Sequence, residues 1–267
     1  MPYLILPWAA KLAHDARILD VVEDLLGPNL LIYTSTFFIK EPHSPTSAAW
    51  HQDSTYYALK PKEETTVWIA LTEADKDAGC MEAPSFRGEP RQLRHASRVV
   101  EHSVNRASQM IVEPLDEASP VAMPLAAGAF SMHHGLCPHR SGPNSADHRR
   151  IGLGLNYIPT HVRPAGSIKP VAMLPRGADR FGHFELVEMA KADWTRKVWP
   201  STTGLSLFTG TATLKKRPGT PSSPPEDGST KVTPRGGRIP LEDDGREKTW
   251  PYGIRLTWPG LNQSLRP

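Results

Sequence analysis

The spacing of hydrophobic residues changes once along the chain, from a helical period to a shorter one. Between Ala9 and Leu26 apolar side chains recur every three or four residues, which predicts one amphipathic helix. Gly27 and Pro28 follow directly, and such a pair is typical of a helix end. The folded part is therefore expected to begin with a helix.

Past this helix the apolar residues gather in short runs rich in β-branched and aromatic side chains. The runs cover residues 29–40, 64–73, 108–114, 128–134 and 150–159, and Pro, Gly, Asp or Ser bounds each of them. No long helical pattern separates them, which argues against a parallel sheet built from βαβ units. Many short strands with turn-rich connections indicate a mainly β fold, either a sandwich or a closed barrel of the jelly-roll kind. A second helix is expected over residues 185–197, where the folded part should end.

The composition of the chain changes near residue 198. Of the 27 prolines, ten lie between Pro200 and Pro267, in a segment that is also rich in Gly, Ser and charged residues. Such a segment cannot bury enough apolar surface to offset the entropy lost on ordering. We therefore expect a folded domain over residues 1–197 and a disordered tail over residues 198–267. The tail has a basic excess but no recognisable nucleic-acid-binding motif, so no nucleic-acid partner is expected.

Overall composition indicates a soluble globular protein. Hydrophobic residues make up 39% of the chain and charged residues 22%, and no apolar run is long enough to span a membrane. Cys80 and Cys137 are the only cysteines, so no disulfide framework is implied and a reducing cytoplasm is the expected location. The net charge of +3 says little about partners.

A pair of possible metal ligands, His51 and Asp53, lies within the run Trp50–Thr55. If this run is a strand, both side chains project from the same face, because strand side chains alternate. One imidazole nitrogen and one carboxylate oxygen could then reach a common metal ion. A distant third histidine would complete a set of two histidines and one carboxylate, which binds Fe(II) on one side and leaves three positions open.

The third ligand is expected from the histidine-rich stretch 131–144, which contains His133, His134 and His139. Arg150 follows His139 by eleven residues, at the start of the last strand-like run. A planar guanidinium binds a carboxylate through two parallel hydrogen bonds, so this arginine could hold the far end of a metal-chelating 2-oxo acid. Its neighbour Arg149 would face the opposite way on a strand.

Three sequence blocks resemble the phytanoyl-CoA dioxygenase family of Fe(II)/2-oxoglutarate-dependent dioxygenases, in particular its bacterial small-molecule branch. They are WHQDSTYY at 50–57, TTVWIALTEADKDAGCM at 65–81 and HRSGPNSADHRRIGLGLNYIPTHVR at 139–163. The resemblance runs from about residue 7 to about residue 193, with the blocks in family order. It implies a double-stranded β-helix (jelly roll, cupin-like) with flanking helices. It also implies Fe(II), 2-oxoglutarate and O₂, and hydroxylation of an unactivated C–H bond in a small organic substrate with release of succinate and CO₂.

The resemblance also assigns roles to individual residues. By position, the implied iron ligands are His51, Asp53 and His139, and the implied contacts of 2-oxoglutarate are Arg150, Ser141, Thr36 and Trp68. Within the histidine-rich stretch it favours His139 over the other two. Related halogenases carry a small residue in place of Asp53, so this aspartate favours hydroxylation over halogenation.

The chain departs from the family pattern at two places. Family members usually begin with a further strand and helix, so an N-terminally short domain is expected. The segment 83–90 lacks the histidine that the family has in this turn. Two other functions remain open: a non-catalytic relative that acts as a binding protein, and a zinc hydrolase with the same three ligands, in which Arg150 would have no role. The substrate and the oligomeric state are not readable from the sequence.

Overall fold

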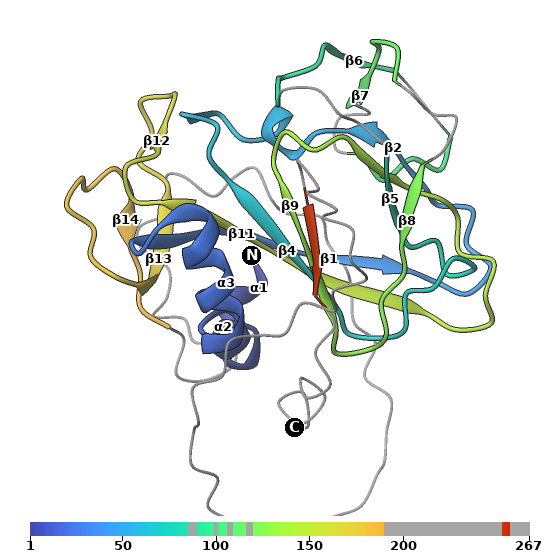
Figure 1. Cartoon of the computed structure of the whole chain (residues 1–267), viewed down its shortest axis with the longest axis horizontal. Helices are drawn as coiled ribbons and strands as arrows, with labels where there is room; N and C mark the ends of the chain where they lie inside the picture. The colour runs from blue at the N-terminus through green and yellow to red at the C-terminus, as the bar shows by residue number, and fades with distance from the viewer. Residues whose placement is uncertain (85–89, 99–100, 106–108, 116–119, 190–252, 257–267) are drawn as a thin grey trace, which may run out of the picture. The chain divides into compact units, whose positions relative to one another are not determined.

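The computed structural model describes residues 1–84, 90–98, 101–105, 109–115, 120–189 and 253–256, which belong to one compact unit. They form a mainly β fold with a large and a small sheet and three N-terminal helices (Figure 1). The mainly β prediction is confirmed. No helix in the described ranges has both the length and the apolar character needed to span a bilayer.

The large sheet has seven strands in the order β14-β13-β1-β11-β4-β9-β15. In chain order these are β1 (Leu30–Lys40), β4 (Thr65–Ala70), β9 (Phe130–His134), β11 (Arg150–Pro159), β13 (Val171–Arg176), β14 (Glu185–Leu186) and β15 (Gly253–Leu256). Every neighbouring pair is antiparallel except β13 with β14. Strands far apart in the chain thus lie side by side, as in β1 and β11.

The small sheet has the order β2-β10-β5-β8, with β2 at Ala48–His51, β5 at Met81–Ala83, β8 at Val121–Met123 and β10 at His139–Ser141. Two short ribbons complete the strands: β3 (Leu59–Lys60) with β12 (Arg163–Pro164), and β6 (His95–Ser97) with β7 (Gln109–Ile111). A single 3₁₀ turn, η1 (Asp53–Thr55), follows β2.

The helices are α1 (Pro2–Ile5), α2 (Pro7–Ala13) and α3 (Ala16–Leu26). The prediction of one continuous helix from residue 9 was wrong, because the chain breaks before α3. Asp15 has an extended backbone, and its carboxylate accepts a hydrogen bond from the Arg17 backbone N–H at 3.0 Å, which caps α3. The predicted end at Gly27 is confirmed, since this glycine has a φ of 85°.

The hydrophobic core lies between these helices and one face of the large sheet. Leu12, Ile18 and Val22 from the helices belong to the same buried cluster as Ile32, Val67 and Leu155 from β1, β4 and β11. Because strand side chains alternate, the residues between them point to the other face. On β11 that other face carries Arg150, Gly152, Gly154 and Asn156.

Of the two predictions for the C-terminal part, the structure contradicts the helix, and the disordered tail stays a prediction. Glu185–Leu186 form a strand paired with β13, so a helix beginning at residue 185 was wrong, and residues 190–197 lie outside the described ranges. Four residues of the expected tail form β15, which pairs with β9 (Figure 1). The rest of residues 198–267 lies outside the described ranges, where the disordered tail stays a prediction.

Candidate metal centre

The two histidines of the candidate site face each other across a strand pair. β2 ends at His51, β10 begins at His139, and the two residues are directly opposite in the antiparallel register. Their ring centroids are 4.1 Å apart. The pairing of β10 with β2 therefore brings together residues from two distant sequence blocks.

Asp53 lies close to these two histidines, but strand alternation, on which the prediction relied, is not the reason. The strand ends at His51 and η1 begins at Asp53, so the alternation argument does not hold there. The turn nevertheless places Asp53 Oδ1 at 3.8 Å from His51 Nε2 and at 3.7 Å from His139 Nε2. Donor atoms of the three residues all lie within 4.8 Å of one another, close enough for one ion to bind each at about 2.1 Å after small shifts.

Backbone carbonyls fix the orientation of both imidazoles. His51 Nδ1 lies 2.8 Å from the Ala49 carbonyl oxygen, and His139 Nδ1 lies 3.0 Å from that of Cys137. A carbonyl only accepts, so each Nδ1 carries the hydrogen and each Nε2 presents a lone pair toward Asp53. This tautomer is the one that a metal bound through Nε2 requires.

Electrostatics favour the metal-binding protonation state. Burial lowers the pKa of His51, and it lowers the pKa of His139 further. Burial alone would raise the pKa of Asp53, but the surrounding histidines outweigh it and hold this pKa well below its usual range. At neutral pH the site therefore presents neutral imidazoles and an ionised carboxylate, and no proton has to leave before a cation binds.

The second oxygen of Asp53 is held by other side chains. Thr66 Oγ1 donates to Oδ2 at 2.7 Å, and His133 Nε2 lies 3.1 Å from the same oxygen. Thr66 on β4 and His133 on β9 are directly opposite in register, and Asn156 Nδ2 donates to Thr66 at 3.3 Å. The two oxygens of Asp53 thus face different partners.

This arrangement separates the three candidate histidines. His139 faces Oδ1 together with His51, whereas His133 contacts Oδ2. The ring of His134 instead accepts the Leu136 backbone N–H at Nδ1, 3.0 Å away. The roles of His133 and Thr66 could not be read from the sequence, because they depend on the pairing of β4 with β9.

Arg150 lies in the same cavity with part of its guanidinium unpaired. The side chain is buried, its Nη1 donates to the Gly79 carbonyl at 2.6 Å, and its Nε has no partner. Its Cζ lies 5.3 Å from the centre of the Trp68 ring. Burial lowers the pKa of Arg150 to about 10, so the group stays cationic at neutral pH. Arg149 points away and pairs with Glu41 at 2.8 Å, as the alternation of strand side chains predicted.

Of the three other residues expected to contact 2-oxoglutarate, two line the cavity and one does not. Trp68 and Ser141 line the cavity that holds His51, Asp53, His139 and Arg150. Thr36 is exposed and is not among the residues that line it, although it pairs with Gly154 and so shares the sheet face that carries Arg150. Lys40, at the end of β1, was missed. It is buried, and its Nζ donates to Ser141 Oγ at 2.8 Å.

Two glycines make room for the aromatic rings of the site. A Cβ on Gly152 would lie 2.0 Å from the Trp68 ring, and one on Gly154 would lie 2.8 Å from the Phe38 ring. Both rings line the cavity. The alternating glycines of RIGLGLN therefore allow the rings of Trp68 and Phe38 to pack directly against the backbone of β11.

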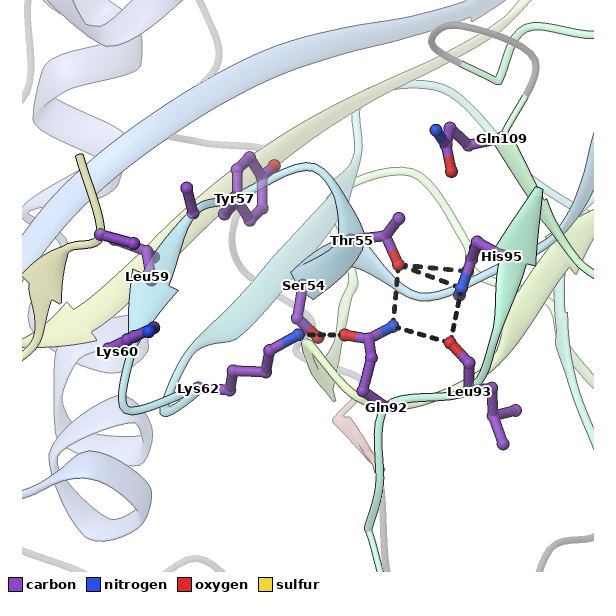
Figure 2. A pocket seen from close by; sticks show the side chains of 12 residues that line it. Ser54, Thr55, Tyr57, Leu59, Lys60, Lys62, Gln92, Leu93, His95 and Gln109 are labelled. Atoms are coloured by element: carbon purple, nitrogen blue, oxygen red, sulfur yellow. Dashed lines mark hydrogen bonds between the residues drawn. The ribbon is translucent and has the colours of Figure 1, made fainter. Parts of the chain in front are cut away.

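The cavity at the donor atoms has a volume of about 60 Å³. A larger cavity of about 430 Å³ is lined by Ser54 and Thr55, which directly follow Asp53 in the sequence, and by Lys62, Gln92 and His95, among others (Figure 2). It contains none of the three donors. We place the candidate centre in the smaller cavity, because the donor atoms and the partly unpaired arginine converge there.

A second group of possible ligands, Glu73, Asp75 and His148, also has donor atoms within 4.8 Å of one another. It lies nearer the surface, and Asp75 already accepts the Ala78 backbone N–H at 2.7 Å. It has no buried unpaired group beside it among the described residues, so it is the weaker candidate.

Comparison with known proteins decides the family. The model of the phytanoyl-CoA dioxygenase (PhyH) family matches residues 7–152. The chain belongs to the phytanoyl-CoA dioxygenase family. The structure of the non-heme monooxygenase ThoJ in its apo form is 32% identical, with a TM-score of 0.66, over 73% of this chain and 71% of that one. The predicted family and the predicted jelly-roll fold with flanking helices are both confirmed.

Curated relatives are more distant. A probable alpha-ketoglutarate-dependent hypophosphite dioxygenase of Stutzerimonas stutzeri is 27% identical over 168 residues, and phytanoyl-CoA dioxygenase domain-containing protein 1 of Bos taurus is 29% identical over 167 residues. Each match covers 61% of this chain and 57% of the relative. The chain thus spans somewhat more than half the length of these relatives.

Proposed function

We propose that this protein is an Fe(II)- and 2-oxoglutarate-dependent dioxygenase that hydroxylates a C–H bond of a small organic molecule. The observation that carries the proposal is the convergence, in one buried cavity, of His51, Asp53 and His139 with the partly unpaired Arg150. Family membership supports the reaction class.

The donor set fits Fe(II). Two neutral imidazole nitrogens and one carboxylate oxygen on one side of an ion leave the opposite positions for other ligands. The hydrogen bonds from the Nδ1 atoms of His51 and His139 and the tether on Asp53 Oδ2 hold the donors in place before any ion arrives. A zinc hydrolase would need the same ligands, but it would leave Arg150 without a function.

The other end of the cavity fits the co-substrate. Arg150 offers a charged donor without a protein partner, and Ser141 offers a hydroxyl in the same cavity, so both would bind the distal carboxylate of 2-oxoglutarate. Trp68 would lie against the carbon chain. Thr36 would flank the co-substrate from the neighbouring part of β1, on the sheet face that it shares with Arg150.

When bound, Fe(II) supplies the oxidative chemistry: O₂ and 2-oxoglutarate are converted to succinate and CO₂, and the remaining oxygen atom is inserted into a substrate C–H bond. The residues of the chain bind and orient the reactants and keep water out of the buried cavity. Asp53 would occupy the iron position that chloride takes in halogenases, so the expected product is an alcohol.

Anaerobic titration with Fe(II) and then 2-oxoglutarate tests the proposal. We expect a weak visible charge-transfer band for the native protein and its loss in His139→Ala. His134→Ala is the matched control and should keep the band, because His134 accepts the Leu136 backbone N–H and does not contact Asp53 in the described part of the structure. Absence of a band in the native protein, or its persistence in His139→Ala, would contradict the assignment.

A further inference from the structure

Lys40 is a second buried cation at the arginine end of the cavity. It is the last residue of β1 and pairs directly with Arg150 on β11. Lys40 is only 2% exposed, and Arg150 is 4% exposed. Two adjacent basic side chains are thus withdrawn from water.

No carboxylate among the described residues contacts either cation. Lys40 Nζ donates to Ser141 Oγ and to the Gly142 carbonyl, and Arg150 donates to the Gly79 carbonyl. All three acceptors are neutral. Burial and the neighbouring Arg150 lower the pKa of Lys40 to about 7, and the one titratable group that acts against them is the Cys80 thiol. Buried charges are costly unless they are paired, so this end of the cavity favours an anionic ligand.

The hydrogen bond from Lys40 also sets the direction of the Ser141 hydroxyl. In the protonated form of Lys40, which an anion in the cavity would favour, the ammonium group donates and cannot accept, so Ser141 Oγ is the acceptor in this contact. The hydrogen of Ser141 must therefore point elsewhere. Ser141 lines the cavity with Arg150, whereas Lys40 lies behind it and does not.

We propose that Lys40 is a positioning residue for the co-substrate: it orients Ser141 as a donor toward the distal carboxylate of 2-oxoglutarate and adds a second positive charge beside Arg150. This inference rests on the proposed function. Within the described residues Lys40 donates to Ser141 and Gly142 and to none of the three metal ligands, so it should affect binding of the distal carboxylate and leave the metal end unchanged.

The test compares two 2-oxo acids on native protein and on Lys40→Met. 2-Oxoglutarate has a distal carboxylate, and 2-oxobutyrate chelates a metal in the same way but lacks that group. We expect Lys40→Met to weaken 2-oxoglutarate binding roughly tenfold or more in anaerobic Fe(II) titrations, as for a lost hydrogen bond to a charged group. Its affinity for 2-oxobutyrate, and the band at saturation, should match those of the native protein.

A second comparison asks whether Lys40 acts through Ser141. The effects of Lys40→Met and Ser141→Ala should not add, because the serine loses its orientation in the first variant and its hydroxyl in the second. If the methionine variant fails to fold, Lys40→Gln removes the charge with a smaller change in polarity and is titrated in the same way.

The outcomes are separable. Equal weakening for both 2-oxo acids would show a general disturbance of the cavity and overturn the proposal, as would unchanged binding of 2-oxoglutarate. Fully additive effects of the two substitutions would overturn the role of Ser141. A native protein that gives no band with Fe(II) and 2-oxoglutarate would instead contradict the proposed function itself.

Discussion

His133 should control metal affinity by holding Asp53, without binding the metal. Its Nε2 is 3.1 Å from Asp53 Oδ2, while Oδ1 faces the other two donors. His133→Phe keeps a planar aromatic ring at this position and removes this hydrogen bond. The substitution breaks no second hydrogen bond, because Nδ1 of His133 has no partner among the described residues.

The size of the effect follows from what remains on Oδ2. A hydrogen bond to a charged group contributes about 1.5–3 kcal/mol, but Thr66 still donates to the same oxygen in the variant. The loss should therefore lie near the lower value, which corresponds to roughly a tenfold weaker metal affinity. The double variant with Thr66→Val releases Oδ2 from both donors and should lose more than either single variant.

Competition between the protein and a chromophoric chelator for Fe(II), under anaerobic conditions, measures the affinity. His134→Phe is the matched control and should bind Fe(II) like the native protein, since His134 contacts the Leu136 backbone N–H. Complete loss of binding in His133→Phe, with native stability, would show that His133 is itself a ligand. An unchanged affinity would show that the hydrogen bond to Oδ2 does not hold Asp53. Either result refutes the reasoning.

Two further predictions concern stability. Burial raises the pKa of Glu64 to about 8, and neither of its oxygens has a hydrogen-bond partner, since the nearby Ser54 hydroxyl donates to the Gly135 carbonyl. The folded protein therefore keeps a proton that the unfolded chain loses near pH 4.5, so stability should fall by up to about 1.4 kcal/mol per pH unit between those values. The lowered pKa values of His51, His139 and Lys40 act in the opposite direction, so the contribution of Glu64 is read as the difference between two profiles. In urea unfolding from pH 5 to 8, the stability of the native protein relative to Glu64→Gln should fall as the pH rises, whereas the exposed control Glu63→Gln should follow the native profile. A constant difference between native protein and Glu64→Gln would contradict the prediction. Gly152→Ala would place a Cβ 2.0 Å from the Trp68 ring, so it should lower the free energy of unfolding by about 1–3 kcal/mol or more and weaken 2-oxoglutarate binding, because that ring lies beside Arg150. Gly166→Ala has open space at its Cβ and should change neither quantity; a native-like Gly152→Ala would show that the ring moves aside freely.

Local patterns in the sequence were enough to predict the strands β1, β4, β7, β9 and β11, and to select three residues whose possible donor atoms lie close together in the structure. Alternation correctly separated Arg149, which pairs with Glu41, from the buried Arg150. It failed at Asp53, because a 3₁₀ turn replaces the strand after His51. The helix prediction failed in a similar way at Asp15, where an N-cap interrupts an apolar spacing that continues on both sides. Both errors lie at element boundaries, which hydrophobic spacing does not define.

The supporting residues could not be predicted, because their partners lie on other strands. Nothing near Lys40 in the sequence indicates that it pairs with Arg150 or reaches Ser141. In the same way, the contact of His133 with Asp53 depends on the pairing of β9 with β4 and on the turn after β2. Spacing within one block identifies donors on one element, but the register between strands decides which donors converge.

The cavity has a carboxylate at one end and basic side chains at the other. Because of this arrangement, ligand binding should change the stability of the protein. At one end Asp53 is ionised between neutral imidazoles, and at the other Arg150 and Lys40 face neutral acceptors only. Each end lacks a counter-ion of its own, so the unliganded site costs stability that well-packed apolar residues would not. A divalent cation at the carboxylate end and an anion at the basic end would relieve both costs together. A chelating 2-oxo acid with a distal carboxylate spans the two ends, because one part of it binds the metal and the other is an anion. Fe(II) and 2-oxoglutarate together should therefore raise the melting temperature of the native protein more than the sum of their separate effects.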